Sequence, residues 1–396
     1  MFYPHPNCKT DNYDIVNCSS DNVLCVLRKV LQDKRFENYS FVVVCYDESK
    51  RLSYYEYCKR IRGDINVCFL TNHDRIAFLK NFYKASIILT GTSHQVFQYK
   101  RKSQKVYCLN YFSPFKDDYY YIHNLGVKDE ERLLHTNNSL INCIITTSDI
   151  CSRIMANDIP LSLSKCLSLG FPRNDNFYNP SIELKKRLVE IIGLNFSKII
   201  CYTPTYRDYE RDGSDLCDAS LTIKKNVLGT TDSFDIDIMS RLLTEMNAIM
   251  IYKFHPLQEK SIVKNNNTQR IISYSKLVNN INFSLYDLLP ISDVLITDYT
   301  STSFDFLHAN RPIIYYFYDY DKYCKNRGFS FDPIDMVCAG PVVYNIGELC
   351  EQLVDVMNNK DAYQEKRAAI HRFINKYHDD YSSDRILDLI LTGKRV

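Results

Sequence analysis

The chain lacks a long apolar segment, an excess of charge of one sign and closely spaced pairs of cysteines. Its apolar runs fall far below the ~18 residues that a helix needs to span a bilayer, so we expect no transmembrane segment. The residues after Met1 show neither the basic region nor the apolar core of a signal peptide. With 49 basic and 47 acidic residues, the formal net charge is +2, which does not call for nucleic acid as a partner.

The 15 cysteines stand singly, and no C-x-x-C motif occurs. Zinc ribbons and thioredoxin-like redox sites need such pairs and are therefore not expected. In a chain of 396 residues, unpaired cysteines are typical of small buried side chains in a reducing compartment. This pattern indicates a cytoplasmic protein.

What the sequence does contain is a regular alternation of short apolar runs with amphipathic segments. The runs are β-branched and aromatic and are bounded by polar or turn residues, which is typical of strands buried on both faces. Helical periodicity lies between them, for example over 182–192 and 236–246. The alternation predicts an α/β fold with parallel sheets and crossover helices. The predicted strands are 41–45, 85–89, 106–109, 141–145, 198–202, 248–252, 293–296 and 312–317.

These strands fall into two sets of four, separated by a segment rich in Gly, Pro and Asn at 170–179. We therefore expect two doubly wound, Rossmann-like domains at 1–172 and 173–375. A C-terminal helical segment, 376–396, could pack back on the first domain. Such domains present the carboxyl ends of their strands to a central cleft, so residues that directly follow strands are the first candidates for function.

Two strands of the second domain end near side chains suited to phosphate. The strand 198–202 runs into a loop that ends in Arg207, and an arginine in a cleft-facing loop can bind phosphate through two hydrogen bonds. The strand 248–252 is followed by His255, which Pro256 biases toward an extended conformation. That histidine can donate to a phosphate or act as a general acid. A surface Arg–Asp pair and a structural histidine are the alternatives.

The most informative segment follows the predicted strand 293–296. Four hydroxyl residues stand in a row at 300–303, where a helix is expected to begin. Unpaired backbone N–H groups and the positive end of the helix dipole make such a start an anion site without a glycine-rich loop. Ordinary N-capping is the alternative, but four consecutive hydroxyls exceed what capping requires.

A later loop adds Arg327 as a further cation and Gly328, which permits close approach of the backbone. Together these groups suit a diphosphate whose charge is neutralised by the protein, so we expect no metal. Aspartate pairs with the D-x-D spacing of some metal sites do occur, but this spacing is common by chance. They are Asp319-x-Asp321 and Asp235-x-Asp237.

Six motifs follow one another over the second domain, and Gly170-Phe-Pro-Arg-Asn-Asp precedes them. They are Tyr202-Thr-Pro-Thr-Tyr-Arg-Asp, His255-Pro256, Ile291-Ser-Asp-Val-Leu-Ile-Thr-Asp-Tyr-Thr-Ser, Arg311-Pro-Ile-Ile-Tyr-Tyr, Arg327-Gly-Phe-Ser-Phe-Asp and Gly340-Pro-Val-Val. In this order they resemble the CDP-glycerol glycerophosphotransferase family, which builds teichoic acids and phosphopolyol capsules. Each motif alone is weak, but six in sequence are specific, and the resemblance covers roughly residues 20–390.

The resemblance implies a GT-B-like fold. It also implies transfer of glycerol phosphate or ribitol phosphate from a CDP-activated donor to a hydroxyl of a polymer or primer, with CMP released and no cofactor required. His255 and Arg207 would act at the donor pyrophosphate as catalytic residues. The substrate-binding residues implied are Thr203, Pro204, Thr205, Asp298, Thr300, Ser301, Thr302, Asp305, Arg327 and Gly328.

One departure from the family lies in the first domain. The family carries a Trp-His-Gly-Thr-Pro segment whose histidine is the proposed catalytic base, and the aligned segment here has Tyr111 in its place. With an ordinary pKa of about 10, a tyrosine is a poor base at neutral pH. Asp117 or Asp118 is the preferred substitute, with His123 and His94 also nearby in the sequence. A missing base need not abolish phosphoryl transfer, which depends largely on positioning and charge stabilisation.

Lys100, Arg101, Lys102 and Lys105 make a basic stretch beside this altered segment. It is either a solvated loop or a contact for an anionic polymer or lipid, and the latter would place the protein at the inner face of the cell membrane. Three functions stay open. They are a polyol-phosphate transferase, a GT-B glycosyltransferase that uses a nucleotide sugar in capsule or surface glycan synthesis, and a catalytically degenerate relative. The complete donor-side set favours the first.

Overall fold

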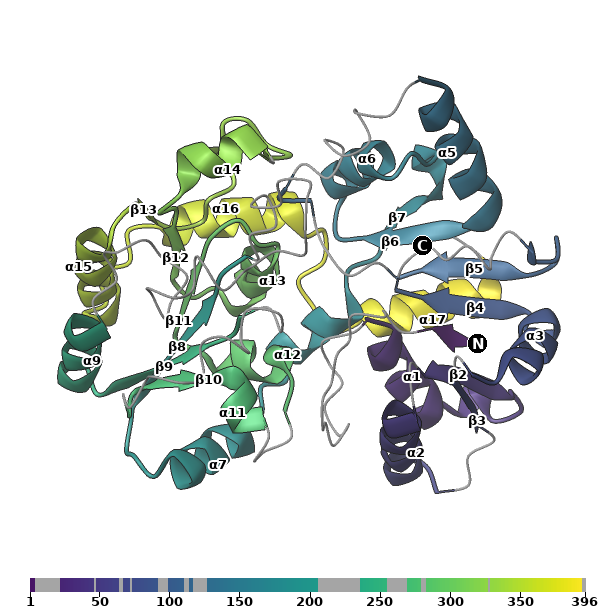
Figure 1. Cartoon of the computed structure of the whole chain (residues 1–396), viewed down its shortest axis with the longest axis horizontal. Coiled ribbons are helices and arrows are strands. Elements are labelled where there is room, and N and C mark those ends of the chain that lie inside the picture. Colours follow the sequence, from purple (N-terminus) through teal and green to yellow (C-terminus); the bar gives the residue numbers. More distant parts are fainter. Residues whose placement is uncertain are drawn as a thin grey trace.

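Two parallel β-sheets lie side by side in the computed structural model, each covered by helices on both faces (Figure 1). We call the parts built on them the first and the second domain. None of the described helices is long and apolar enough to cross a membrane. The structure describes residues 1–3, 22–45, 48–63, 67–71, 73–91, 99–109, 114–116, 127–205, 236–254, 269–278, 283–326 and 328–393.

The sheet of the first domain has the strand order β3-β2-β1-β4-β5-β6-β7, and neighbouring strands are parallel. Its strands are rich in Val, Ile and Cys, and most of their side chains are buried because helices cover both faces. The strands are β1 (Phe2–Tyr3), β2 (Phe41–Cys45), β3 (Val67–Thr71), β4 (Ile87–Thr90), β5 (Lys105–Cys108), β6 (Cys143–Thr146) and β7 (Cys166–Ser168).

The sheet of the second domain has the order β10-β9-β8-β11-β12-β13 and is also parallel. Strands β8 and β11 are neighbours at its centre, although about ninety residues separate them, so the chain reverses its direction of winding between them. The strands are β8 (Lys198–Thr203), β9 (Ala248–Tyr252), β10 (Ile271–Ser273), β11 (Val294–Thr297), β12 (Ile313–Tyr316) and β13 (Val342–Val343).

Helices cover the first sheet with α1 (Asn22–Gln32), α2 (Glu48–Ile61) and α17 (Ser382–Thr392) on one face, and with α3 (Arg75–Lys84), α5 (Val127–Leu140) and α6 (Asp149–Asp158) on the other. On the second sheet α9 (Ile236–Glu245) and α15 (Ile346–Met357) cover one face. The other face carries α7 (Ile182–Ile192), α11 (Tyr274–Val278), α12 (Leu285–Leu288), α13 (Thr302–Phe306) and α16 (Gln364–Ile374), while α14 (Tyr320–Asn326) follows β12.

The eight strands predicted from the sequence are confirmed, and so are the helices at 182–192 and 236–246, the second ending one residue early. Helix α7 starts where the Ser181 side chain accepts a hydrogen bond from the backbone of Leu184, and it ends at Gly193 with φ +68°. The strands that sequence reasoning missed are β1, β3, β7, β10 and β13. Four of these have only two or three residues, too few to show a periodic pattern.

The chain passes between the domains twice. The first passage is the 3₁₀ segment η5 (Pro172–Tyr178), and the second follows α16 and leads into α17, drawn in yellow against the purple α1 in Figure 1. Asp175 of η5 caps α17, since its carboxylate accepts hydrogen bonds from the backbone N–H groups of Ser382 and Ser383, both at 3.0 Å. The two passages are therefore bound to each other.

Candidate functional site

The carboxyl ends of β8 and β11 are tied together side by side. Thr297 donates a hydrogen bond from its hydroxyl to the carbonyl of Thr203 at 2.8 Å. One residue further, both carboxylate oxygens of Asp298 lie at 2.8 and 3.0 Å from the backbone N–H of Thr205. Asp298 is 1% exposed, so its described contacts hold the loop after β8 against the loop after β11. The structure thus brings together Thr203, Pro204, Thr205 and Asp298, as expected for residues that follow neighbouring strands.

The hydroxyl cluster stands at the same edge of the sheet. Helix α13 begins at Thr302, with Ser301 as its N-cap residue. The Thr300 hydroxyl accepts from the backbone N–H of Thr302 at 3.3 Å and lies 3.2 Å from the Thr302 hydroxyl. Ser303 turns inward and donates to the carbonyl of Thr300 at 2.9 Å. Thr300, Ser301 and Thr302 are half-buried, so a ligand at this edge could reach them.

Asp305, one turn into α13, has a different environment. It is 1% exposed, and its Oδ2 accepts hydrogen bonds from Nη2 of Arg173 at 2.9 Å and from the Tyr286 hydroxyl. The Arg173 guanidinium also lies 4.8 Å from the ring centre of Tyr286 and 5.0 Å from that of Phe171. Burial raises the pKa of Tyr286 well above its ordinary value, which keeps the hydroxyl protonated as a donor. These contacts fix α13 to the link between the domains.

Sequence reasoning gave Arg173 no role, although the residue lies within the linker motif that begins at Gly170. The available signal was a cation within a short linker between two domains, where burial is expected. A buried arginine needs a carboxylate or comparable partner, and its partner here lies 132 residues further along the chain.

A segment of the first domain reaches into the second. Phe115 packs with its ring centre 5.1 Å from that of Phe304 and 6.3 Å from that of Phe329. The backbone N–H of Ser330 donates to the carbonyl of Phe115 at 3.2 Å, and Lys116 pairs with Phe329 as an antiparallel bridge. This segment directly follows the one that carries Tyr111. The acceptor-side segment of the sequence analysis is therefore anchored beside α13.

Gly328 has φ +74°, a conformation that favours glycine, and it directs Phe329 into a cluster of aromatic rings. The ring of Phe329 stacks on Tyr323 and Tyr320, at interplanar angles of 19° and 13°. Tyr299, next to Asp298, stacks on Tyr323 with ring centres 3.8 Å apart. The backbone of Gly328 thereby lies beside the loop that carries the hydroxyl cluster.

Several predicted residues lie outside the described part of the chain, and their positions stay predictions. Their loops nonetheless start at known places. The loop of Arg207 follows β8, which ends at Thr203, and the loop of His255 follows β9, which ends at Tyr252. At this carboxyl edge the backbone N–H of Lys253 bonds to the carbonyl of Tyr202 at 2.9 Å. The residues outside the description are His255, Arg207, Asp117, Asp118, Tyr111, Arg327, His94 and His123.

Of the two D-x-D pairs, Asp235 lies outside the described residues. Asp319 accepts a hydrogen bond from the hydroxyl of Tyr299 at 3.1 Å, which gives it a place in the aromatic cluster. Within the described ranges no group of three or more His, Cys, Asp or Glu side chains could hold a metal ion.

Comparison with known proteins decides the family. Residues 19–392 match the family model described as CDP-Glycerol:Poly(glycerophosphate) glycerophosphotransferase. The chain belongs to this glycerophosphotransferase family. The resemblance seen in the six motifs is thereby confirmed.

Relatives and solved structures agree with this assignment. The chain is 28% identical over 243 residues to the teichoic acid glycerol-phosphate primase of Bacillus subtilis, covering 61% of this chain and 55% of that protein. It is 30% identical over 258 residues to the teichoic acid glycerol-phosphate transferase of Staphylococcus aureus, covering 62% and 59%. The chain thus spans little more than half the length of these two glycerophosphotransferase-family relatives.

The fold is similar to that of the wall teichoic acid polymerase TagF, with a TM-score of 0.72 and 20% identity over 94% of this chain and 85% of that one. The GT-B-like fold class expected from the resemblance is confirmed.

Proposed function

We propose that this glycerophosphotransferase-family protein transfers a polyol phosphate from a CDP-activated donor to a hydroxyl of a wall or capsule polymer, or of its lipid-linked primer, and releases CMP. The observation that carries the proposal is the meeting of the donor-side motifs at the carboxyl edge of β8 and β11, around Asp298 and the hydroxyls of Thr300 and Thr302. Matched relatives are named for glycerol phosphate or for ribitol phosphate, which supports a polyol phosphate as the transferred group.

In this proposal the donor pyrophosphate lies against the start of α13. Backbone N–H groups and hydroxyls at Thr300–Thr302 bind its oxygens, and Arg207 and His255 act on the phosphate that leaves with CMP. The acceptor oxygen attacks the β-phosphorus, and the bond from that phosphorus to the bridging oxygen breaks. Protein cations and N–H groups neutralise the charge, so the reaction needs no added cofactor.

The acceptor enters from the first domain. Phe115 and Lys116, which lie between Tyr111 and Asp117 in the sequence, contact the second domain at Phe329. Asp117 or Asp118 takes the proton of the attacking hydroxyl in this scheme. Closure of the two domains would exclude water and align the attack.

We also propose that α3 holds the protein on the inner face of the cell membrane. Ile76, Leu79 and Tyr83 recur on one face of this helix and are 85%, 45% and 44% exposed. Lys80 and Lys84 lie along one side of this face. Apolar side chains rimmed by lysines fit an anionic lipid surface, where the rings and alkyl groups enter the interface and the amino groups meet headgroup charge.

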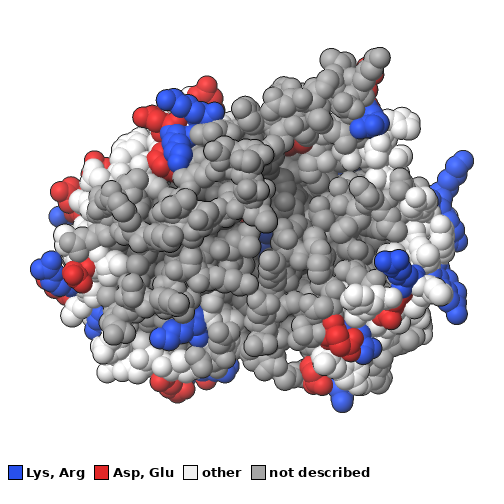
Figure 2. Space-filling view, viewed as in Figure 1, with Lys and Arg blue, Asp and Glu red and all other residues white. Residues whose placement is uncertain are grey.

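The predicted basic stretch lies next to this helix. Gln104 donates from Nε2 to the carbonyls of Phe82 and Ala85 at 2.5 and 2.7 Å, which holds the loop containing Arg101 against the end of α3. Burial, with repulsion from Lys105, lowers the pKa of Lys100. Figure 2 shows Lys and Arg side chains gathered on the outer edge of the first domain.

Calorimetry tests the donor proposal directly. The wild-type chain is titrated with CDP-glycerol, CDP-ribitol, CMP and a UDP-sugar, and the titrations are repeated with Arg207→Ala. We expect tight binding of a CDP-polyol that the variant loses, while Lys186→Gln on the outer face of α7 binds as the wild type does. Binding of a UDP-sugar in preference to every CDP compound would instead assign the protein to nucleotide-sugar transfer.

A further inference from the structure

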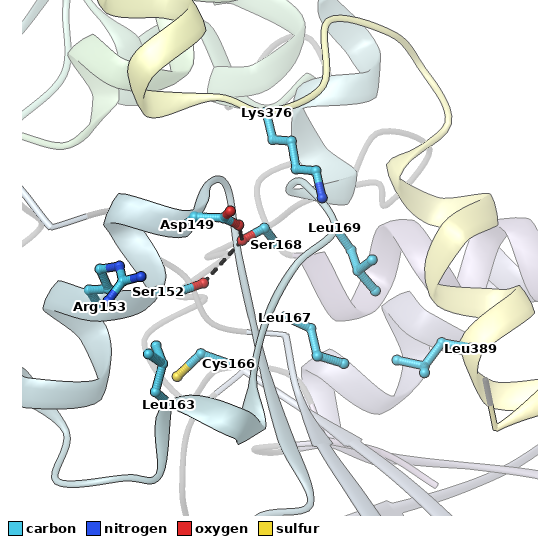
Figure 3. Close-up of a pocket in the computed structure, with 10 residues that line it drawn as sticks. All are labelled: Asp149, Ser152, Arg153, Leu163, Cys166, Leu167, Ser168, Leu169, Lys376 and Leu389. Carbon is cyan, nitrogen blue, oxygen red and sulfur yellow. Dashed lines mark hydrogen bonds between the residues drawn. The ribbon is translucent and has the colours of Figure 1, made fainter. Parts of the chain in front are cut away.

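A cavity of about 290 Å³ opens at the carboxyl ends of β6 and β7 in the first domain (Figure 3). Its walls come from α6, the 3₁₀ segment η4 (Leu163–Lys165), β7 with Leu169 after it, the passage after α16, and α17. None of the residues proposed for donor or acceptor chemistry lines it. In a doubly wound sheet, the carboxyl ends of the strands are the usual place for a ligand, and this volume suits a small one.

The polar part of the cavity is an ordered row of hydroxyls. Ser152 is 4% exposed, and its Oγ lies 2.6 Å from Oγ1 of Thr146 and 3.1 Å from Oγ of Ser168. Ser168 in turn donates to Oδ1 of Asp149 at 2.9 Å. Because the single Ser168 proton points to Asp149, the Ser168 hydroxyl is left to accept from Ser152.

Two cations face the cavity from different elements. Arg153 extends from α6, and Lys376 reaches in from the C-terminal passage, with its amino group directed toward the side formed by Ser168 and Leu169 (Figure 3). Within the described ranges neither cation forms a salt bridge, and the Lys376 amino group lies 5.3 Å from the ring centre of Tyr377. With Asp149 as the one acid in the lining, the cavity carries an excess of one positive charge. Leucine side chains complete the wall, so the cavity suits an anion with a short carbon chain.

The cavity is connected to the donor side by two consecutive residues. Asn375 donates from Nδ2 to the carbonyl of Phe304 in α13 at 3.1 Å. Lys376 donates from its backbone N–H to the carbonyl of Thr147, directly after β6, at 2.8 Å. The peptide that joins Asn375 and Lys376 therefore spans from the helix of the hydroxyl cluster to the wall of the cavity.

We propose that this cavity binds one phosphate-bearing unit of the acceptor chain, behind the unit whose hydroxyl reacts. The inference rests on the proposed transfer of polyol phosphate, because such a chain carries a negative charge at every repeat. Arg153 and Lys376 bind the phosphate, Ser152 and Ser168 lie beside the polyol, and the leucines contact its carbon atoms. The ligand class is a phosphate ester of a short polyol.

The test uses a synthetic trimer of glycerol phosphate with the full chain. Calorimetry compares the wild type with the double variant Arg153→Gln/Lys376→Gln, with the charge-conserving Lys376→Arg, and with Lys186→Gln as a matched exposed cation elsewhere. We expect the double variant to bind the trimer at least about tenfold more weakly, and the other two to bind within about twofold of the wild type. In turnover, the double variant should raise the KM for the trimer and leave kcat and the KM for CDP-glycerol unchanged.

The remaining outcomes each overturn the inference. Equal binding of the trimer by the wild type and the double variant would show that the acceptor binds outside this cavity. Absence of trimer binding by the wild type would show that the protein does not bind this acceptor. Inorganic phosphate or free glycerol 3-phosphate that binds as tightly as the trimer reduces the cavity to a general anion site. CDP-glycerol titrated into the same samples separates the two proposals, because failure of the donor to bind contradicts the proposed function and leaves the trimer result to be judged by itself.

Discussion

Arg173 and Asp305 form a buried ion pair, 2.9 Å between Nη2 and Oδ2, that joins the link between the domains to helix α13, which begins at the hydroxyl cluster. Their side chains are 5% and 1% exposed. A pair this deeply buried is sensitive to the loss of either member, because the remaining charge keeps its cost of desolvation without a partner.

We expect Asp305→Ala to lower the free energy of unfolding by roughly 3–5 kcal/mol, as measured by urea denaturation. The double variant Arg173→Met/Asp305→Leu should recover most of that loss, since it removes both charges and restores apolar volume. An Asp305→Ala protein with an unchanged urea midpoint would show that the ion pair contributes little. If Asp305 also binds donor, CDP-glycerol affinity will stay reduced in the recovered double variant.

The cap that Asp175 places on α17 gives a second prediction. Its Oδ2 accepts from both the backbone N–H and the hydroxyl of Ser383, and Oδ1 accepts from the backbone N–H of Ser382. Burial raises the pKa of Asp175, while these hydrogen bonds oppose the rise. Asp175→Ala leaves two buried N–H groups unpaired and should cost about 2 kcal/mol or more.

Asp388→Ala on the same helix is the matched control. Its carboxylate is half exposed and pairs with Arg35 at the surface, so its removal should change stability by less than about 0.5 kcal/mol. Urea denaturation measures both variants. Equal losses in Asp175→Ala and Asp388→Ala would contradict a capping role for Asp175.

A third prediction concerns pH and a row of three histidines behind α13. The Tyr178 hydroxyl lies 2.9 Å from Nδ1 of His308, Nε2 of His371 lies 3.3 Å from the same atom, and the ring of His378 stacks on His371 with centres 4.0 Å apart. Burial, together with repulsion within the row, lowers the pKa of His308 to about 3 and that of His371 to about 2.

Because these folded-state pKa values lie below the ordinary value of about 6.5, the unfolded chain binds more protons than the folded one as the pH falls below that value. The free energy of unfolding is therefore highest at neutral pH. It falls in acid, by roughly 2 kcal/mol for each buried histidine at pH 5. Urea midpoints between pH 7.5 and 5 should fall less steeply in His371→Phe than in the wild type. The exposed His135, as His135→Gln, should leave the slope unchanged, and parallel slopes in all three proteins would refute the assignment.

Membrane contact gives a fourth prediction. The variant Ile76→Ser/Leu79→Ser should bind vesicles that contain an anionic lipid at least about tenfold more weakly than the wild type in a sedimentation assay. Lys80→Gln/Lys84→Gln should lose binding mainly to the anionic vesicles and should reduce its dependence on salt. Ile182→Ser, at a position that is 74% exposed in the second domain, is the matched control. Vesicle binding that survives both sets of changes in α3 would exclude this helix as the contact.

Local pattern was sufficient for much of the fold. Strands such as β9 and β11 are uniformly apolar because both of their faces are buried, and this signature can be read from four or five residues. The positions of Thr203 and Asp298 at neighbouring strand ends follow from the same pattern. Strands of two residues, such as β1 and β13, are strands only because they pair with the strands beside them. No local sequence pattern predicts them.

Other parts of the site depend on contacts between distant segments. Nothing local pairs Arg173 with Asp305, and nothing in the sequence shows that Phe115 packs among the rings of the second domain. The cavity is similar, because Lys376 meets α6 only through the C-terminal passage. The periodicity of apolar residues indicates which side chains are buried but not which residues they contact. These contacts therefore required the three-dimensional structure.

The return of α17 has a consequence for how the protein is made. Ile386, Leu387 and Leu389 are built into the core of the first domain, against α1 and η5. Domains usually fold in order as the ribosome releases them, the N-terminal one first. Here the core of the first domain is incomplete until α17 is translated, after the whole of the second sheet. During synthesis the second domain can therefore complete its core before the first domain does.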